Sequence, residues 1–140
     1  MIAGQCLALR ARRLQRTVTR AYDAALRPHG LTVAQLGLLS ALALAPDAQP
    51  KTLCTMLDLE KSTLSRNVRL LAAQGWIDAS RTGRTQRLRL TPLGGRTLGA
   101  ALPAWQRAQQ RMLRLLPADD IQTLRRSWGP RPTGLSGPSS

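Results

Sequence analysis

Residues 53–77, LCTMLDLEKSTLSRNVRLLAAQGWI, contain two helical patterns separated by only four residues, 58–61. The first helix is marked by apolar residues at helical spacing: Leu53, Met56 and Leu57. The second helix is expected from Ser62 to about Gln74. Its apolar residues recur at spacings of four and three and predict a buried stripe, formed by Leu64, Val68 and Leu71. The stretch therefore predicts a tight pair of helices.

The other side of the second helix is cationic and rich in hydrogen-bonding groups. It carries Ser62, Thr63, Ser65, Arg66 and Arg69. Small hydroxyl residues let a helix approach a duplex closely, and arginine pairs bidentately with guanine. A solvated amphipathic helix would also turn its arginines outward, so the segments around the helix pair must decide between the two interpretations.

A basic β-hairpin is predicted directly after the helix pair. Ile77 begins the extended segment and Gly83 supplies its turn. Further along, Arg87 and Arg89 alternate with Leu88 and Leu90, which places arginines on one face and leucines on the core. Helix, turn, helix and basic hairpin is the layout of a winged helix-turn-helix, in which the second helix enters the major groove and the hairpin reaches a minor groove. The hairpin residues expected to contact DNA are Arg81, Arg84 and Arg87.

Helical patterns continue on both sides of this unit. A helix is expected from about Cys6 to Leu26, and Pro28-His29-Gly30 ends it. Thr32 and Gln35 have capping-box spacing and predict the start of the next helix, whose buried stripe is expected at Leu36, Leu39, Leu42 and Ala43.

After the hairpin, Thr91-Pro92 predicts the start of a long helix that reaches about Leu116. Pro103 is expected to kink or divide it. Its apolar markers are Leu98, Leu102, Trp105, Met112 and Leu113. A last helix is expected from Asp119 to Trp128.

These patterns predict one mainly α-helical domain with a small β-hairpin, residues 1–128. Within it, residues 31–92 form the DNA-binding lobe. The helices at 5–27 and 93–128 offer apolar faces that a monomer cannot fully cover, so we expect them to form a homodimer. Residues 129–140 are rich in Gly, Pro and Ser and are expected to be a flexible tail.

The charge of the chain indicates a polyanionic partner. Its 21 Lys and Arg residues against 7 Asp and Glu give a formal net charge of +14. Phe is absent and there is 1 Tyr, so the aromatic platforms that bind single strands are missing and double-stranded DNA is favoured. No apolar stretch is long enough to span a bilayer and no signal-peptide order is present, which predicts a cytoplasmic protein without a membrane partner.

Enzyme activity is not expected. Cys6 and Cys54 are the only cysteines and form no CxxC pair, and His29 is the only histidine. These residues supply neither a metal site nor a His-based catalytic group, and no cofactor is expected. His29 is interpreted as a turn residue and Cys54 as a core residue.

The chain resembles the MarR family of bacterial transcriptional regulators over about residues 5–128. The resemblance rests on residues 53–71, on Gly75-Trp76-Ile77 and on Leu90-Thr91-Pro92-Leu93-Gly94. It implies an obligate dimer with intertwined terminal helices, a palindromic operator, repression of transcription, and often release by a small phenolic or oxidant signal. At the wing, where the family commonly has Asp-x-Arg, this chain has Thr82-Gly83-Arg84, so the arginine is kept and the acid is missing.

The resemblance also raises two possibilities for an effector. A ligand cleft is implied, with Leu36, Leu39 and Trp105 as apolar lining, although these residues serve equally well as core. Oxidant-sensing members of the family carry a reactive cysteine early in the first helix. Cys6 lies two residues before the matching position, Ala8, so a redox role and an inert interface role both stay open for Cys6.

One alternative from another functional class is kept. A winged fold can serve as scaffold for a small-molecule-binding or protein-interaction module whose basic surface meets an acidic protein. Selection of bound DNA duplexes distinguishes that module from a sequence-specific regulator.

Overall fold

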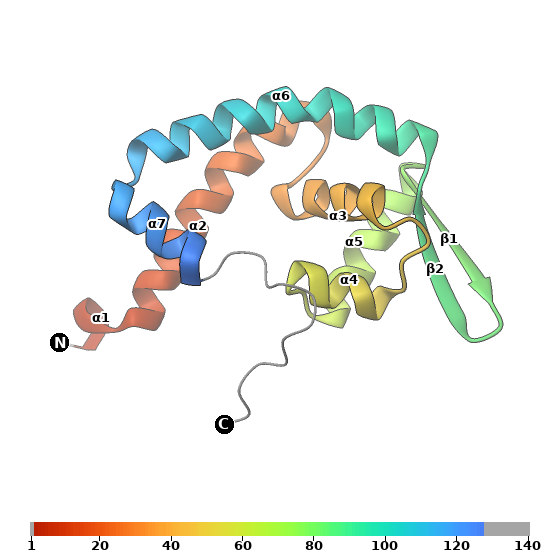
Figure 1. Ribbon diagram of the computed structural model, residues 1–140, viewed down its shortest axis with the longest axis horizontal. Helices are drawn as coiled ribbons and strands as arrows, with labels where there is room; N and C mark the ends of the chain where they lie inside the picture. The colour runs from red at the N-terminus through yellow and green to blue at the C-terminus, as the bar shows by residue number, and fades with distance from the viewer. Residues whose placement is uncertain (1, 128–140) are drawn as a thin grey trace.

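The computed structural model of the protein describes residues 2–127, which form a helical arm and a winged lobe (Figure 1). The arm consists of α1 (Ile2–Gln5), α2 (Leu7–Leu26), α6 (Pro92–Leu115) and α7 (Ala118–Ser127). The lobe consists of the 3₁₀ turn η1 (Arg27–His29), α3 (Val33–Leu44), α4 (Pro50–Leu57), α5 (Lys61–Ala73), β1 (Ile77–Thr82) and β2 (Thr85–Leu90). The predicted tail at 129–140, and Trp128, lie outside the described residues.

The long helix α6 connects the two parts. It runs along the top of Figure 1 from the hairpin to α7, and α2 packs beneath its far half. The mainly helical winged fold expected from the sequence is therefore confirmed.

The core of the lobe is built mainly from leucines of α3, α4, α5 and β2, together with Leu26 at the end of α2. Eight leucines have fully buried side chains: Leu26, Leu38, Leu39, Leu42, Leu53, Leu64, Leu71 and Leu88. Each buried leucine contributes about 1.5–3 kcal/mol through the apolar surface removed from water. The predicted stripe of α5 is confirmed, since its buried residues are Leu64, Val68 and Leu71.

The predicted helix starts are confirmed by their caps. Thr32 and Gln35 form both hydrogen bonds of a capping box at the start of α3. Asp23 of α2 accepts a hydrogen bond from the Val33 N–H at 2.7 Å, which joins the arm to the first turn of α3. Thr91 caps α6 by accepting from the Gly94 N–H at 3.0 Å.

One residue of the predicted core is wrong. Ala43 is exposed, and Leu38 and Ala41 are buried in addition to the three predicted leucines. The buried face of α3 is therefore wider than predicted and is turned away from Ala43. Met56 and Leu102, which marked α4 and α6 in the sequence, lie on the exposed sides of those helices, at 44% and 38% exposure.

Pro103 does not divide α6, which continues from Pro92 to Leu115. The proline is exposed, so the carbonyl that it leaves without an N–H partner is on the solvent side of the helix. The buried side of α6 includes three small residues: Ala101 and Ala104 belong to the core of the lobe, and Ala108 belongs to a second cluster with Tyr22 of α2.

No helix within residues 2–127 is both long and apolar enough to cross a membrane. Over the same residues, no group of three or more His, Cys, Asp or Glu side chains is arranged to hold a metal ion.

Candidate nucleic-acid interface

The turn between α4 and α5 is short because one residue reverses the chain. Asp58 follows α4 in the left-handed conformation, with φ of 52°, a conformation that Asp tolerates better than most residues. The next N–H, of Leu59, donates to the Cys54 carbonyl at 3.0 Å and closes the end of α4. Helix α5 then begins at Lys61, one residue before the predicted start.

Helix α5 has the two-sided character that the sequence predicted. Its apolar stripe packs into the lobe, and Thr63 is half-buried at the edge of that contact. The exposed polar residues are Ser62, Ser65, Arg66 and Arg69. This face is open to solvent over the length of the helix and is available to a partner.

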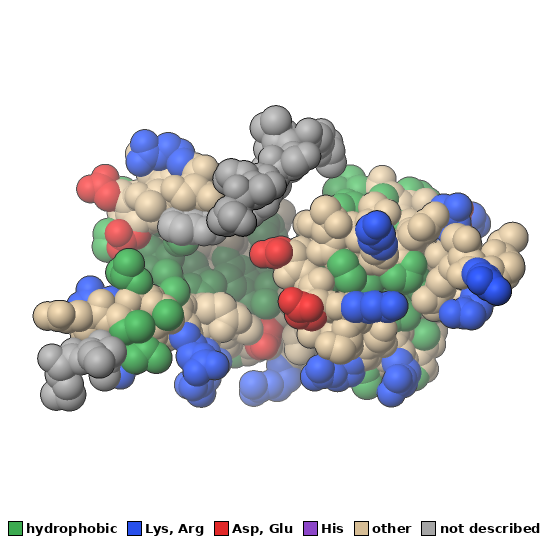
Figure 2. Space-filling view, turned by 90° about the horizontal axis from the view of Figure 1, so that it is seen from below, with side chains coloured by type: hydrophobic (Ala, Val, Ile, Leu, Met, Phe, Trp, Pro, Cys, Tyr) green, Lys and Arg blue, Asp and Glu red, His purple; other side chains and the backbone are tan. Residues whose placement is uncertain are grey.

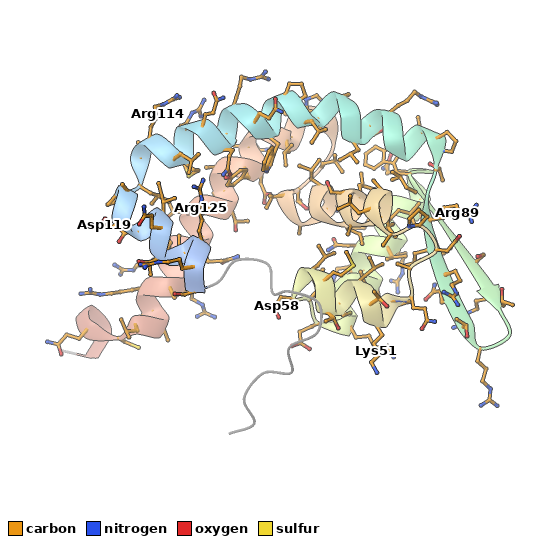
Figure 3. All side chains as sticks on the ribbon, viewed as in Figure 1. Lys51, Asp58, Arg89, Arg114, Asp119 and Arg125 are labelled. Atoms are coloured by element: carbon orange, nitrogen blue, oxygen red, sulfur yellow. The ribbon has the colours of Figure 1, made fainter. Side chains whose placement is uncertain are left out.

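The hairpin forms a wing beside this face. Thr82 pairs with Thr85, so the turn consists of Gly83 and Arg84 alone. Gly83 has φ of 63°, a conformation that a side chain would disfavour. The arginines predicted to contact DNA, Arg81, Arg84 and Arg87, are all exposed. Figure 3 shows the tip of the hairpin reaching well beyond the helices of the lobe.

A groove of about 280 Å³ brings α5 and the wing together. Ser65 and Arg69 line it from α5, and Ala79 and Gln86 line it from the two strands. Two of the predicted residues of the helix, Ser65 and Arg69, therefore share this groove with the strands of the hairpin, while the predicted arginines of the hairpin lie outside its lining.

The charges of this surface are unevenly distributed. Figure 2 shows Lys and Arg side chains spread over the lobe, and Asp and Glu side chains gathered at its border with the arm. Asp58, at the end of α4, lies on the border side in Figure 3, whereas Lys51 lies on the underside of α4. The underside of the lobe and its wing are therefore cationic, and the arm carries basic and acidic side chains of its own.

One acid of the wing region was missed by sequence reasoning. Asp47, in the loop between α3 and α4, forms an ion pair with Arg89 of β2. The Arg89 guanidinium lowers the pKa of the Asp47 carboxyl through this hydrogen bond, and the pKa of Arg89 is raised in turn. The Arg89 side chain is thus held in an ion pair within the protein, whereas Arg84 lies at the exposed tip of the hairpin.

The residues expected to line a ligand cleft are close to one another but not equally accessible. Leu36 and Leu39 are buried in the core of the lobe, at 4% and 0% exposure. Trp105 of α6 is half-buried and packs against that core. Cys6, the candidate redox residue, is half-buried between α1 and α2, and its thiol is free.

Comparison with known proteins gives one family. A model of the MarR family matches residues 29–88, which contain the helix pair and most of the wing. The M. tuberculosis regulator MosR in complex with DNA is 28% identical, with a TM-score of 0.75 over 89% of this chain and 96% of that one. The PcaV regulator of Streptomyces coelicolor in complex with its natural ligand is 27% identical, with a TM-score of 0.74 over 90% of this chain and 94% of that one.

The fold is shared more widely than the sequence. The transcriptional repressor CouR, known from Rhodococcus jostii RHA1 and solved on a 23-mer DNA duplex, is 24% identical, with a TM-score of 0.78 over 91% of this chain and 92% of that one. A search among curated proteins found no match to the sequence.

Proposed function

We propose, since this chain belongs to the MarR family of transcriptional regulators, that it is a repressor that binds a pseudo-palindromic DNA duplex as a homodimer. The observation that carries the proposal is the exposed face of α5. Its apolar stripe is buried, so Arg66 and Arg69 are held outward on a rigid helix beside an arginine-bearing wing. CouR, which shares the fold and is a transcriptional repressor solved on DNA, supports repression.

In the proposed complex, α5 lies in the major groove. Arg66 and Arg69 read base edges, while Ser62, Thr63 and Ser65 bind phosphates or bases. At the wing, Arg84 enters a narrow minor groove whose negative potential attracts a guanidinium group. Arg81 and Arg87 bind flanking phosphates. Two protomers place two such helices on half-sites about one helical turn apart.

Selection of duplexes from a random pool by the purified protein tests sequence-specific binding. We expect a consensus with two inverted half-sites, bound at least about 1,000-fold more tightly than random duplex at physiological salt. Equal affinity for selected and random duplexes would contradict the proposal and favour the protein-interaction alternative.

The dimer is proposed from apolar side chains that the arm leaves in solvent. They lie on α2, α6 and α7 and comprise Leu7, Leu9, Leu14, Leu102, Leu115 and Leu124. A second copy would cover them. We expect light scattering to give twice the 15.3 kDa chain mass and Leu14→Glu to shift the protein toward monomer.

Leu44→Glu is the matched control for this experiment. Leu44 is 83% exposed at the end of α3 and lies on the lobe, not on the arm. The control should keep the mass of the wild-type protein. A wild-type mass of one chain at micromolar concentration would overturn the dimer.

We further propose an effector cleft between the arm and the lobe, lined by Leu36, Leu39 and Trp105. The contact of Trp105 with the lobe core supports it, as does the PcaV structure, which holds that protein's natural ligand. Titration of salicylate against the DNA complex should release DNA by millimolar concentration, while acetate at equal ionic strength should not. Equal effects of the two anions would mean screening alone.

Cys6 offers a second proposed route, through an oxidant. Its position between two arm helices would couple modification of the thiol to the dimer. Hydrogen peroxide should then release DNA from the wild-type protein and not from Cys6→Ser. Equal release from both proteins would leave Cys6 as an inert interface residue.

A further inference from the structure

Two consecutive loop residues bind three consecutive residues of the wing. Asp47 and Ala48 belong to the connection between α3 and α4, and Arg87, Leu88 and Arg89 belong to β2. The segments are about forty positions apart in sequence, and every contact between them lies at the base of the hairpin, away from its tip.

Each of the three residues of β2 has its own contact. Arg89 donates from Nε to Asp47 Oδ1 at 2.9 Å and from Nη2 to the other carboxylate oxygen. Arg87 donates from Nη1 to the Asp47 carbonyl oxygen at 3.3 Å. The Leu88 N–H donates to the Ala48 carbonyl oxygen at 3.0 Å, and these two residues form a β-bridge.

The loop pays a conformational cost to make these contacts. Asp47 has φ of 61°, in the left-handed region that non-glycine residues rarely occupy. In this conformation its backbone carbonyl and its carboxylate both face β2, and Ala48 is placed for the bridge. Leu88, between the two arginines, is 1% exposed in the lobe core.

We propose that Asp47 is a positioning residue that fixes the wing relative to the recognition helix α5. Helix α4 follows the Asp47 loop directly and packs on α5, so a strand clamped to this loop keeps a defined place beside that helix. The clamp anchors the base of the hairpin, whereas the two-residue tip with Arg84 has no such anchor. The inference rests on the proposed DNA-binding function.

Removing the charge of Asp47 changes DNA affinity in opposite directions, depending on whether Asp47 positions the wing or acts only through its charge. An acid near DNA repels phosphate, so its neutralisation should strengthen binding if charge alone mattered. A positioning role gives the opposite sign, because the wing loses its fixed place. We expect Asp47→Asn to weaken binding to the selected operator about threefold.

Asp78→Asn is the control with the same charge change. Asp78 is exposed on β1 and stands opposite Arg89 in the hairpin, so its charge also raises the pKa of Arg89. Among the described residues, however, it forms no ion pair with Arg89, whose carboxylate partner is Asp47. It should bind DNA as tightly as wild type or more tightly. Asp47→Gly, which tolerates the positive φ but lacks the carboxylate, should behave like Asp47→Asn.

A double-mutant cycle on DNA binding tests whether Asp47 acts through Arg89. Arg89→Gln should weaken binding as much as Asp47→Asn, and the double variant should be no weaker than either single variant. If Arg89 instead contacted DNA itself, its removal would weaken binding further in the Asp47→Asn background, and the proposal would fall.

Hydrogen exchange on the DNA-free, full-length protein gives a readout that does not depend on DNA binding. The Leu88 amide and its neighbours in β2 should exchange faster in Asp47→Asn than in wild type, and no faster in Asp78→Asn. Unchanged exchange in Asp47→Asn would overturn the clamp. If the wild-type protein bound no duplex, but Asp47→Asn still showed the faster exchange, the proposed function would be overturned and the clamp would stand.

Discussion

Gly94→Ala should destabilise the protein by about 3 kcal/mol, because the added methyl group has no space. Gly94 is buried in the first turn of α6. A Cβ atom there would overlap the Trp76 carbonyl oxygen and lie 2.8 Å from Leu90 Cδ1. The Trp76 carbonyl cannot withdraw easily, since it accepts the Thr91 N–H at 3.1 Å. The start of α6 would have to move away from the wing.

Thermal unfolding at one fixed protein concentration measures the effect. A loss of this size lowers Tm by about 10 °C in a chain of this length. Gly99→Ala is the control on the same helix, because its Cβ would meet nothing within 4 Å. Alanine is favoured over glycine by up to about 1 kcal/mol inside a helix, so the control should be slightly stabilised. Equal Tm values for both variants would show that the close approach at Gly94 is not required.

The parts of the fold that the sequence predicted are those with a local signal. The stripe of α5 repeats within one helix, and the Thr32 and Thr91 caps depend on residues three positions away. Hydrophobic periodicity and capping residues act over such short distances, so they are readable from a single chain. Because the buried stripe of α5 could be predicted, the residues on the opposite, exposed face could be predicted as well.

The missed features depend on partners that are distant in sequence. The buried alanines of α6 carry no strong hydrophobic signal: the core of the lobe buries Ala101 and Ala104, and the cluster around Tyr22 of α2 buries Ala108. Asp47 and Arg89 are 42 positions apart, and no spacing rule connects them. The alternation of residues in β2 correctly predicted that Arg89 lies on its polar face. Only the folded chain shows that Arg89 forms an ion pair with Asp47.

Arg66→Ala and Arg69→Ala should each reduce binding to the selected operator by about 1–3 kcal/mol, or roughly 5- to 150-fold. Both side chains are exposed on the face of α5 opposite its buried stripe, so neither substitution removes a core contact. If the arginine pairs with a guanine, its removal also removes the preference for guanine over other bases at that position. The loss on random duplex should therefore be smaller, and the base preference at one position of each half-site should relax.

Arg84→Ala is the control that separates base reading from charge. Arg84 is exposed at the tip of the wing, and the residue two positions before it is Thr82 instead of an acid that could orient it. Its loss should weaken selected and random duplexes alike and lower the slope of log affinity against log salt by about one phosphate equivalent.

Fluorescence anisotropy on both duplexes at several salt concentrations measures all three variants. If the two helix variants kept the full ratio of specific to random binding while Arg84→Ala lost affinity, the wing and not α5 would be the principal contact with DNA. If Arg84→Ala alone lost selectivity, base reading would lie in the minor groove. A change in selectivity confined to Arg66→Ala and Arg69→Ala is the outcome that places α5 in the major groove, because only there do the four base pairs present distinct patterns to a guanidinium group.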